Sequence, residues 1–277
     1  MQYELPPLAS RELTAWLDGP DRPDISNPIH STAVATTYGF RGALVGGVTV
    51  YGWCVPVILQ AMGDRWLSDG WIDLAFRRPV YPGDRLTISV SEGESGDRLL
   101  RVRNQDGERC LAGTLGLGRA EWLGELASPV RREAEERPAQ LPKLTIDVAP
   151  VGQDLRPMPH EYRPEAMAAY LDEKLQDADR RWRGPDALLH PGWIAAQMTP
   201  MLHYSYDYGP AIHTRTQAQH LVSALADQRV TFAGRFAEAF ERKGDHYGVI
   251  DGVMLGADGA ELARLRHTTI FHVAPRA

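Results

Sequence analysis

The chain has 277 residues, of which 43% are hydrophobic and 24% charged, as in a globular protein with one large domain or two of ordinary size. Its net charge of −6, without a dense cluster of Lys and Arg, excludes a surface that follows nucleic-acid phosphates. Cys54 and Cys110 are too few and too far apart for a disulfide framework or a zinc knuckle. The N-terminus lacks a basic segment followed by an apolar run, and no stretch approaches about 18 consecutive apolar residues, so we expect a cytoplasmic protein without membrane partners.

The N-terminal region is expected to hold a short helix and then a loop. Residues 10–17, SRELTAWL, have a helical pattern with Ser10 as the N-cap and Glu12 in the first turn. Residues 19–28 must form a loop or turn, because their three prolines each remove a backbone donor and restrict the preceding residue.

The longest apolar stretch runs from Gly47 to Met62. Its length favours a helix over a strand, and Pro56 predicts a kink within it. Because the segment is apolar all round, other elements must cover it on every side.

The covering elements follow directly in the sequence. Residues 71–94 are typical of two strands with a turn at Pro82-Gly83-Asp84, and residues 97–118 of two more strands joined at Gln105-Asp106-Gly107. One buried helix followed by an antiparallel sheet is the hot-dog arrangement.

The second half of the chain repeats the first. Residues 164–175 form a predicted helix, and residues 187–202 again place a glycine, Gly192, at the opening of an apolar helix. Strands follow, with turns at Asp227, Gly244 and Asp258-Gly259. Segments 104–114 and 82–90 match segments 256–268 and 225–234 in phase, at an offset of roughly 145 to 150 residues.

These patterns predict a domain boundary as well as a fold class. Residues 124–148 mix charges with prolines and carry no sustained apolar period, so we interpret them as a linker. We expect an N-terminal hot-dog domain over 1–123 and a C-terminal one over 149–277. The fold is then α+β, with two antiparallel sheets, each wrapped around a central apolar helix and paired into one continuous sheet.

The stretch from Asp24 to Tyr51 carries the clearest chemical signal. It contains the turn Asn27-Pro28-Ile29-His30, a Gly39-Phe40 turn, and then Leu44 to Gly47 at the opening of the apolar helix. The first N–H groups of a helix have no partners inside it and carry the positive end of its dipole. A loop histidine next to such donors can hold a carbonyl between a proton-transfer group and free backbone amides.

This stretch resembles the MaoC-like family of (R)-specific enoyl-thioester hydratases and dehydratases, in its double-hot-dog form. The family pattern is approximately Gly-Asp-x-Asn-Pro-x-His, a Gly-Phe turn, and Ile-Ala-His-Gly at the start of the central helix. Two positions depart from it. The acid expected five residues before His30 is Ile25, with Asp24 one residue out of register, and the histidine expected before Gly47 is Gly46.

The resemblance implies a site in the first half. His30 would activate water, Asn27 would shape the turn and assist, and Asp24 is the nearest replacement for the missing acid. The amides at Gly46 and Gly47 would bind the thioester oxygen, and the alternative is that these glycines only allow close packing of helix against sheet. For His30 the alternative is a ring that merely bonds the turn.

Further candidates are two aromatic residues of this stretch and several residues outside it. Tyr38 and Phe40 are predicted to contact the substrate, and Arg77 and Arg78 are placed to bind the phosphates of a carrier. In the second half, Asp177 and His190 are a conceivable composite catalytic pair, although each is more often a surface acid or a helix-opening residue. No pair of histidines has metal-ligand spacing with a carboxylate, so we expect neither a metal nor another cofactor.

Three functions are considered, and we expect the first. The first is a lyase, a hydratase or dehydratase acting on an acyl thioester of coenzyme A or a phosphopantetheine carrier. The second is a thioesterase, which needs an acid on the central helix or the facing strand, and residues 46–62 contain none. The third is a protein that binds acyl thioesters or other hydrophobic ligands, or that has changed chemistry. Association into a homodimer is left open.

Overall fold

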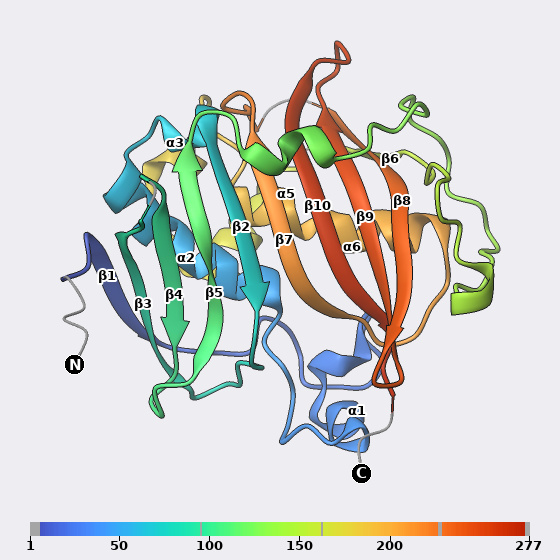
Figure 1. The fold of residues 1–277 in the computed structure, drawn as a ribbon, viewed down its shortest axis with the longest axis horizontal. Helices are drawn as coiled ribbons and strands as arrows, with labels where there is room; N and C mark the ends of the chain where they lie inside the picture. The colour runs from blue at the N-terminus through green and yellow to red at the C-terminus, as the bar shows by residue number, and fades with distance from the viewer. Residues whose placement is uncertain (1–5, 95, 162, 227–228, 275–277) are drawn as a thin grey trace.

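The computed structural model describes residues 6–94, 96–161, 163–226 and 229–274. Its main feature is a ten-stranded sheet in the order β1-β3-β4-β5-β2-β7-β10-β9-β8-β6, in which all neighbours run antiparallel (Figure 1). The strands are β1 Ala9–Thr14, β2 Gly70–Phe76, β3 Arg85–Glu92, β4 Arg98–Arg103, β5 Arg109–Leu117, β6 Met158–His160, β7 Ile212–His220, β8 Val230–Arg242, β9 Asp245–Leu255 and β10 Glu261–His272.

The helices that define the core lie on one face of this sheet, behind it in Figure 1. The α-helices are α1 Thr32–Ala35, α2 Gly47–Met62, α3 Trp66–Asp69, α4 Pro164–Ala169, α5 Pro191–Ala196 and α6 Met198–Ser205. Short turns of 3₁₀-helix are η1 Pro28–His30, η2 Thr36–Tyr38, η3 Glu121–Glu125, η4 Ile146–Val148 and η6 Arg180–Trp182, and η5 Tyr170–Leu175 continues α4 as a π-helix. Within the described ranges, no helix has the length and apolar character needed to cross a membrane.

The strand order reads as a mirror image about the contact between β2 and β7. From that contact outward, β2, β5, β4, β3 and β1 in one half correspond to β7, β10, β9, β8 and β6 in the other. The two halves join through register pairs from Trp71 with Gln219 to Ala75 with Arg215. The predicted double hot dog, with its two sheets paired into one, is therefore confirmed, and the sequence repeat corresponds to this duplication.

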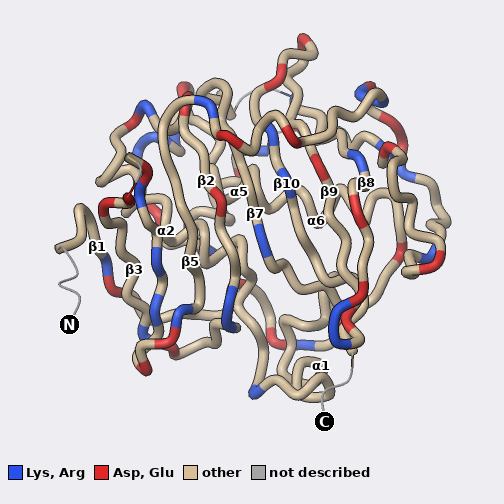
Figure 2. The backbone as a smooth tube through the Cα atoms, viewed as in Figure 1, with Lys and Arg blue, Asp and Glu red and all other residues tan. Residues whose placement is uncertain are grey.

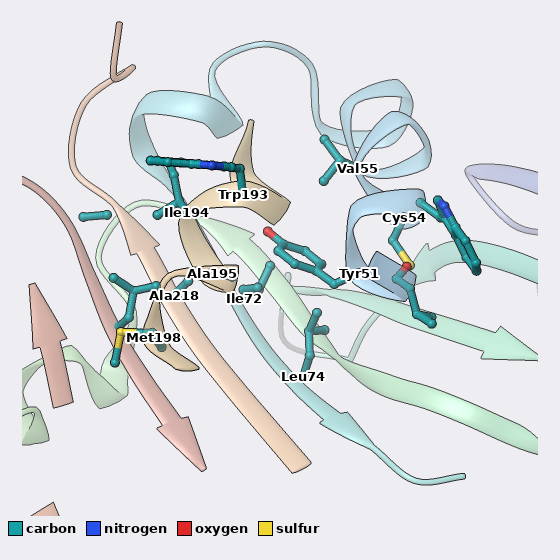
Figure 3. Close-up of a cluster of buried hydrophobic side chains, with 14 of the residues drawn as sticks. Tyr51, Cys54, Val55, Ile72, Leu74, Trp193, Ile194, Ala195, Met198 and Ala218 are labelled. Carbon is teal, nitrogen blue, oxygen red and sulfur yellow. The ribbon is translucent and has the colours of Figure 1, made fainter. Parts of the chain in front are cut away.

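The central helix α2 has the bounds that the apolar stretch predicts, and it continues through Pro56. Tyr51 and Cys54 of α2 pack in one apolar cluster with Ile72 of β2 and Trp193 of α5 (Figure 3). The two central helices approach each other very closely at Gly192, where a Cβ would be 2.9 Å from the Cα of Gly52. This core joins both halves, so neither helix is covered by its own half alone.

The prediction of a helix for residues 10–17 is wrong. Residues 9–14 form β1, an edge strand paired with β3 from Ala9 with Val90 to Thr14 with Arg85. Exposure alternates along the strand, with Ser10 and Glu12 facing solvent and Ala9 buried. The free backbone groups of the β3 edge decide the conformation here, because pairing with them outweighs a weak local helical preference.

The other predicted strands and turns of the two sheets are present, with two qualifications. The three-residue strand β6 was not predicted, and the turn predicted at Asp227 lies outside the described residues. Between β5 and β6 the chain forms only the turns η3 and η4 and otherwise irregular structure. The linker and domain boundaries stay predictions.

The face of the sheet opposite the helices carries charges across the junction of the two halves (Figure 2). Arg215 of β7 donates to Asp73 of β2 at 2.8 and 2.5 Å. Arg266 donates to the buried carboxylate of Asp251, which also accepts from the backbone N–H of Ala127 at 2.7 Å. The segment after β5 is thereby attached to the second half.

Candidate functional site

A cavity of about 1040 Å³ lies between the two halves of the molecule. Its wall includes the loop that precedes α2, the opening of α2, the end of β2, and parts of α5, α6 and the start of β7. Polar residues from both halves line it, among them Asp18, Asn27, His30, Arg77, Arg78, Arg137, Lys174, Gln197, Thr199, His203, Tyr204 and His213. Its size suits a drug-sized or larger ligand, since such pockets measure about 300 to 1,000 Å³.

His30 lies in the cavity wall at the end of η1, and its tautomer follows from its partners. The buried side chain of Ile29 anchors the turn, and Pro28 at its first position fixes the backbone. The Nδ1 atom of His30 is 2.7 Å from the carbonyl oxygen of Leu44, which can only accept. Nδ1 therefore carries the proton in the neutral ring, and Nε2 presents its lone pair as a base.

Asn27 connects this turn to the second half. Its amide donates to the carbonyl of Ala211 at 2.9 Å and accepts from the N–H of the same residue at 3.0 Å. Both bonds together fix the orientation of the amide, so its nitrogen is also the group 3.2 Å from Nε2 of His30. In this structure the Asn27 amide occupies the one lone pair of Nε2, so a water must replace this hydrogen bond before Nε2 can act as a base.

The opening of α2 presents backbone donors to the cavity. Gly46 is the N-cap, without a side-chain cap, and Gly46, Gly47 and Val48 all line the cavity. In the described part of the chain, the N–H groups of Gly47 and Val48 have no hydrogen-bond partner. They are therefore available for a ligand oxygen, where the dipole of a 16-residue helix favours negative charge. Gly47 also packs, since a Cβ there would be 3.1 Å from the ring of Phe76.

Asp18 is the residue of this site that the sequence did not reveal. It is the only carboxylate among the described residues that line the cavity. Its Oδ2 accepts from the hydroxyl of Thr49 at 2.5 Å, and its Oδ1 is 3.5 Å from the N–H of Gly46. No motif marks Asp18, because it follows a segment with a helical pattern that instead forms β1.

The structure places Asp24 away from the cavity. The Asp24 carboxylate pairs with Arg22 at 3.1 Å, and 70% of its side-chain surface is exposed. It does not appear among the lining residues, whereas Asn27 and His30 of the same segment do. A catalytic role for Asp24 therefore stays a prediction without geometric support.

The remaining candidates of the first half divide between the cavity wall and its surroundings. Phe40, Arg77 and Arg78 line the cavity, and Tyr38 packs behind the wall against the small cluster around Ile29. The Arg78 side chain is 64% exposed and lies 3.8 Å from Glu108. Both arginines are thus available to an anionic group, as are Arg137 of the predicted linker and Lys174 of the second half.

Asp177 and His190 are close together, but they are buried outside the cavity wall. His190 is fully buried, and its Nδ1 accepts from the N–H of Gly192 at 3.0 Å, so His190 caps α5. Its Nε2 lies 3.7 Å from the carboxylate of Asp177, beyond hydrogen-bond distance, and Trp182 packs edge-on against the ring. Burial lowers the pKa of His190 despite the neighbouring Asp177. This pair has the contacts of a structural cap.

His213 in β7 adds a further polar group to the wall. Its Nε2 is 3.0 Å from the carbonyl of Arg215, so the neutral ring carries its proton there. The Nδ1 atom is buried and has no partner among the described residues. Burial lowers the pKa of His213 to about 4, so the ring is neutral at neutral pH. The described residues contain no group of three or more His, Cys, Asp or Glu that could hold a metal ion.

No family model and no curated protein matches the sequence. The structure, in contrast, is similar to many solved structures. A MaoC-like dehydratase aligns with a TM-score of 0.56 at 17% identity, covering 88% of this chain and 89% of the other. A conserved Mycobacterium tuberculosis protein with a double hot-dog fold aligns with a TM-score of 0.59 at 11% identity, covering 94% and 93%.

Proteins named for a different reaction align as well. A Lactobacillus plantarum protein named as an oleoyl thioesterase has a TM-score of 0.51 at 11% identity, covering 95% of this chain and 96% of the other. Similarity at these identities establishes the fold and leaves the reaction open. Over most of its length, the chain has the double hot-dog fold that is found in MaoC-like dehydratases.

Proposed function

We propose that the protein is a hydratase or dehydratase that adds or removes water across the α–β bond of an acyl thioester. One observation carries the proposal. The basic Nε2 of His30 and the free N–H groups of Gly47 and Val48 line the same cavity. A base for water and donors for an enolate oxygen are the two elements that this reaction requires.

The chemistry assigns a task to each group. A thioester oxygen bound by the two amides would accumulate negative charge as a water oxygen bonds to the β carbon. His30 would take one proton of that water at Nε2, and its Nδ1 would keep its hydrogen bond to Leu44. Returning the proton from Nε2 to the α carbon completes the addition and restores the neutral ring. The same steps in reverse eliminate water.

The cavity supports an acyl thioester as the ligand class. Apolar side chains of both halves, such as Val45, Phe76 and Ile270, line it and suit an acyl chain. Arginine side chains in the same wall suit the phosphates of coenzyme A or of a carrier-bound phosphopantetheine. The resemblance of residues 27–47 to the MaoC-like motif favours hydration over other thioester chemistry.

Thioester hydrolysis is the second candidate, and Asp18 is the observation that favours it. The sequence lacks an acid on either central helix, but the structure places this carboxylate beside the opening of α2. Water activated between a carboxylate and a histidine could attack a carbonyl held by the helix amides. Hydrolysis releases a thiol, whereas hydration removes the enoyl chromophore and releases none.

The decisive experiment measures the enoyl absorbance and the released thiol in one sample. Crotonyl-CoA and a longer enoyl-CoA are mixed with the protein while the enoyl absorbance and the free thiol are recorded. We expect the enoyl band to decay without thiol release, and His30→Ala to reduce the rate on the order of 100-fold. The exposed His272 at the end of β10 offers a matched control, and His272→Ala should retain the wild-type rate.

Two results would contradict the proposal. Thiol release with an intact enoyl band would identify a thioesterase. No change in either signal, with binding detected by calorimetry, would identify a thioester-binding protein instead.

A further inference from the structure

We propose that Asp18 is the carboxylate that holds the reacting water opposite His30. This inference rests on the proposed function and adds a catalytic residue to it from a different element of the fold. Asp18 lies 12 residues before His30 in the sequence, outside the motif that contains the histidine.

The position of Asp18 is determined by β1. Where β1 ends, Ala15 exchanges two backbone hydrogen bonds of 2.8 Å with the turn at Gly83 and Asp84. The next residue, Trp16, packs against Trp53 of α2, with ring centroids 4.5 Å apart. The chain is thus held at the sheet edge and against the central helix just before Asp18, so its carboxylate reaches the opening of α2.

Gly46 leaves a space between Asp18 and His30. A Cβ on Gly46 would be 3.1 Å from Oδ2 of Asp18 and 3.8 Å from Cε1 of His30. Both side chains therefore border the same point, and Gly46 itself lines the cavity. A side chain at this position would extend into the space that the carboxylate and the ring border, which is where we place the reacting water.

The carboxylate is oriented for this task. The hydroxyl of Thr49 donates to Oδ2, and the more distant N–H of Gly46 faces Oδ1. A carboxylate has about four lone-pair positions, so each oxygen can still accept from water. One O–H of the water would donate to Asp18, which directs the other O–H toward Nε2 of His30.

The proton balance is the same as in the proposed reaction. The water proton moves to Nε2 of His30 as the oxygen bonds to the β carbon, and it then moves to the α carbon. Asp18 keeps its negative charge throughout. That charge stabilises the imidazolium that exists between the two transfers, because opposite charges in a partly desolvated cavity attract strongly.

The test compares Asp18→Asn with Thr49→Val. The asparagine keeps the size of the side chain and removes its charge, and we expect kcat to fall on the order of 100-fold with KM changed only a few-fold. Thr49→Val removes the hydroxyl that bonds Asp18 but keeps the carboxylate and its charge, so we expect only the smaller loss that comes from its weaker orientation. If Asp18 served only to hold the start of α2 through Thr49, the two variants would lose the same activity.

The outcomes separate this proposal from the proposed function. A large loss of kcat in Asp18→Asn with a small loss in Thr49→Val supports it, provided that thermal unfolding shows both variants folded. Asp18→Asn with the wild-type kcat, while His30→Ala is inactive, overturns the role of Asp18 and leaves the function intact. A large loss of kcat in Asp24→Asn instead would show that Asp24, next to the motif position, is the catalytic carboxylate. A wild-type protein that hydrates no enoyl thioester removes both proposals.

Discussion

The two halves of the molecule open their central helices in different ways. In the first half, Gly46 and Gly47 leave the first amides of α2 without partners at the wall of a cavity. In the second half, Pro191 has no N–H to offer and the N–H of Gly192 is bonded by His190. At the first two helical positions, backbone N–H groups are therefore available to a ligand in the first half, whereas in the second half one is absent and the other is bonded.

The histidines next to the two helix openings differ in burial in the same way. His30 is partly exposed to the cavity, whereas His190 is fully buried under Trp182. In the proposed function, duplication of a hot-dog unit allows one helix opening to bind the substrate while the other contributes to the stability of the core. One active site per chain is the expectation that follows.

The largest expected effect comes from removing His190, the N-cap of α5, which tests whether the second helix opening has only a structural role. His190→Ala leaves a cavity in the core and the N–H of Gly192 unpaired, so we expect a loss of about 3 kcal/mol in the free energy of unfolding. His190→Asn should recover part of this loss, because asparagine is a good N-cap. Urea unfolding measures both variants. A loss of activity at unchanged stability would show instead that His190 belongs to the active site.

A pair of glycine substitutions tests the same division with smaller changes. Gly192→Ala places a methyl group 2.9 Å from the Cα of Gly52, where backbone must move, and should cost about 2 kcal/mol. Gly46→Ala places a methyl group 3.1 Å from the Asp18 carboxylate, and we expect it to reduce kcat about 10-fold while changing stability by less than about 1 kcal/mol. Thermal unfolding should show the larger loss of stability in Gly192→Ala, and enzyme assays the larger loss of kcat in Gly46→Ala. If the same variant shows both larger losses, the two openings do not differ in role.

The smallest expected effect is a pH dependence of stability from the buried second half. Burial lowers the pKa of His220 to about 4, with a further contribution from nearby His190. The unfolded chain binds a proton near its ordinary pKa of about 6.5, so stability is fully present above that pH and declines as pH falls toward 4. At pH 5.5 the loss is about 1 kcal/mol.

Urea unfolding between pH 7.5 and 5.5 measures this slope. His220→Leu, which fills a similar volume without a titrating group, should make the slope shallower by the contribution of His220, while the buried His213 and His190 keep theirs. Parallel slopes in the wild type and the variant would assign the dependence to other groups.

Much of the fold was readable from the sequence. The apolar run from Gly47 to Met62 predicted α2 at its observed bounds, because a uniformly apolar segment of that length has few alternatives to a buried helix. The turns at Asp106-Gly107 and Asp258-Gly259 marked equivalent hairpins, since both glycines adopt positive φ. The repeat of these signals predicted the duplicated architecture.

The candidate site was only partly readable. Asn27, His30 and the glycines at 46 and 47 carry a local motif, and the structure brings them together at one cavity. Asp18 could not be found, because its position depends on an edge strand that the local pattern misrepresents as a helix. The local sequence around the motif also does not show that Asp24 lies at the surface and not in the cavity.

Local sequence signals predict the apolar helices, the turns, and the duplication that follows from their repetition. Which carboxylate lies beside Gly46 at the cavity, and which helix opening has unpartnered amides there, depends on the tertiary structure. Those choices depend on contacts between residues far apart in the chain, such as Asp18 with Thr49 and Asn27 with Ala211. Local patterns do not contain that information, because the partners are joined by the pairing of strands and the packing of two central helices.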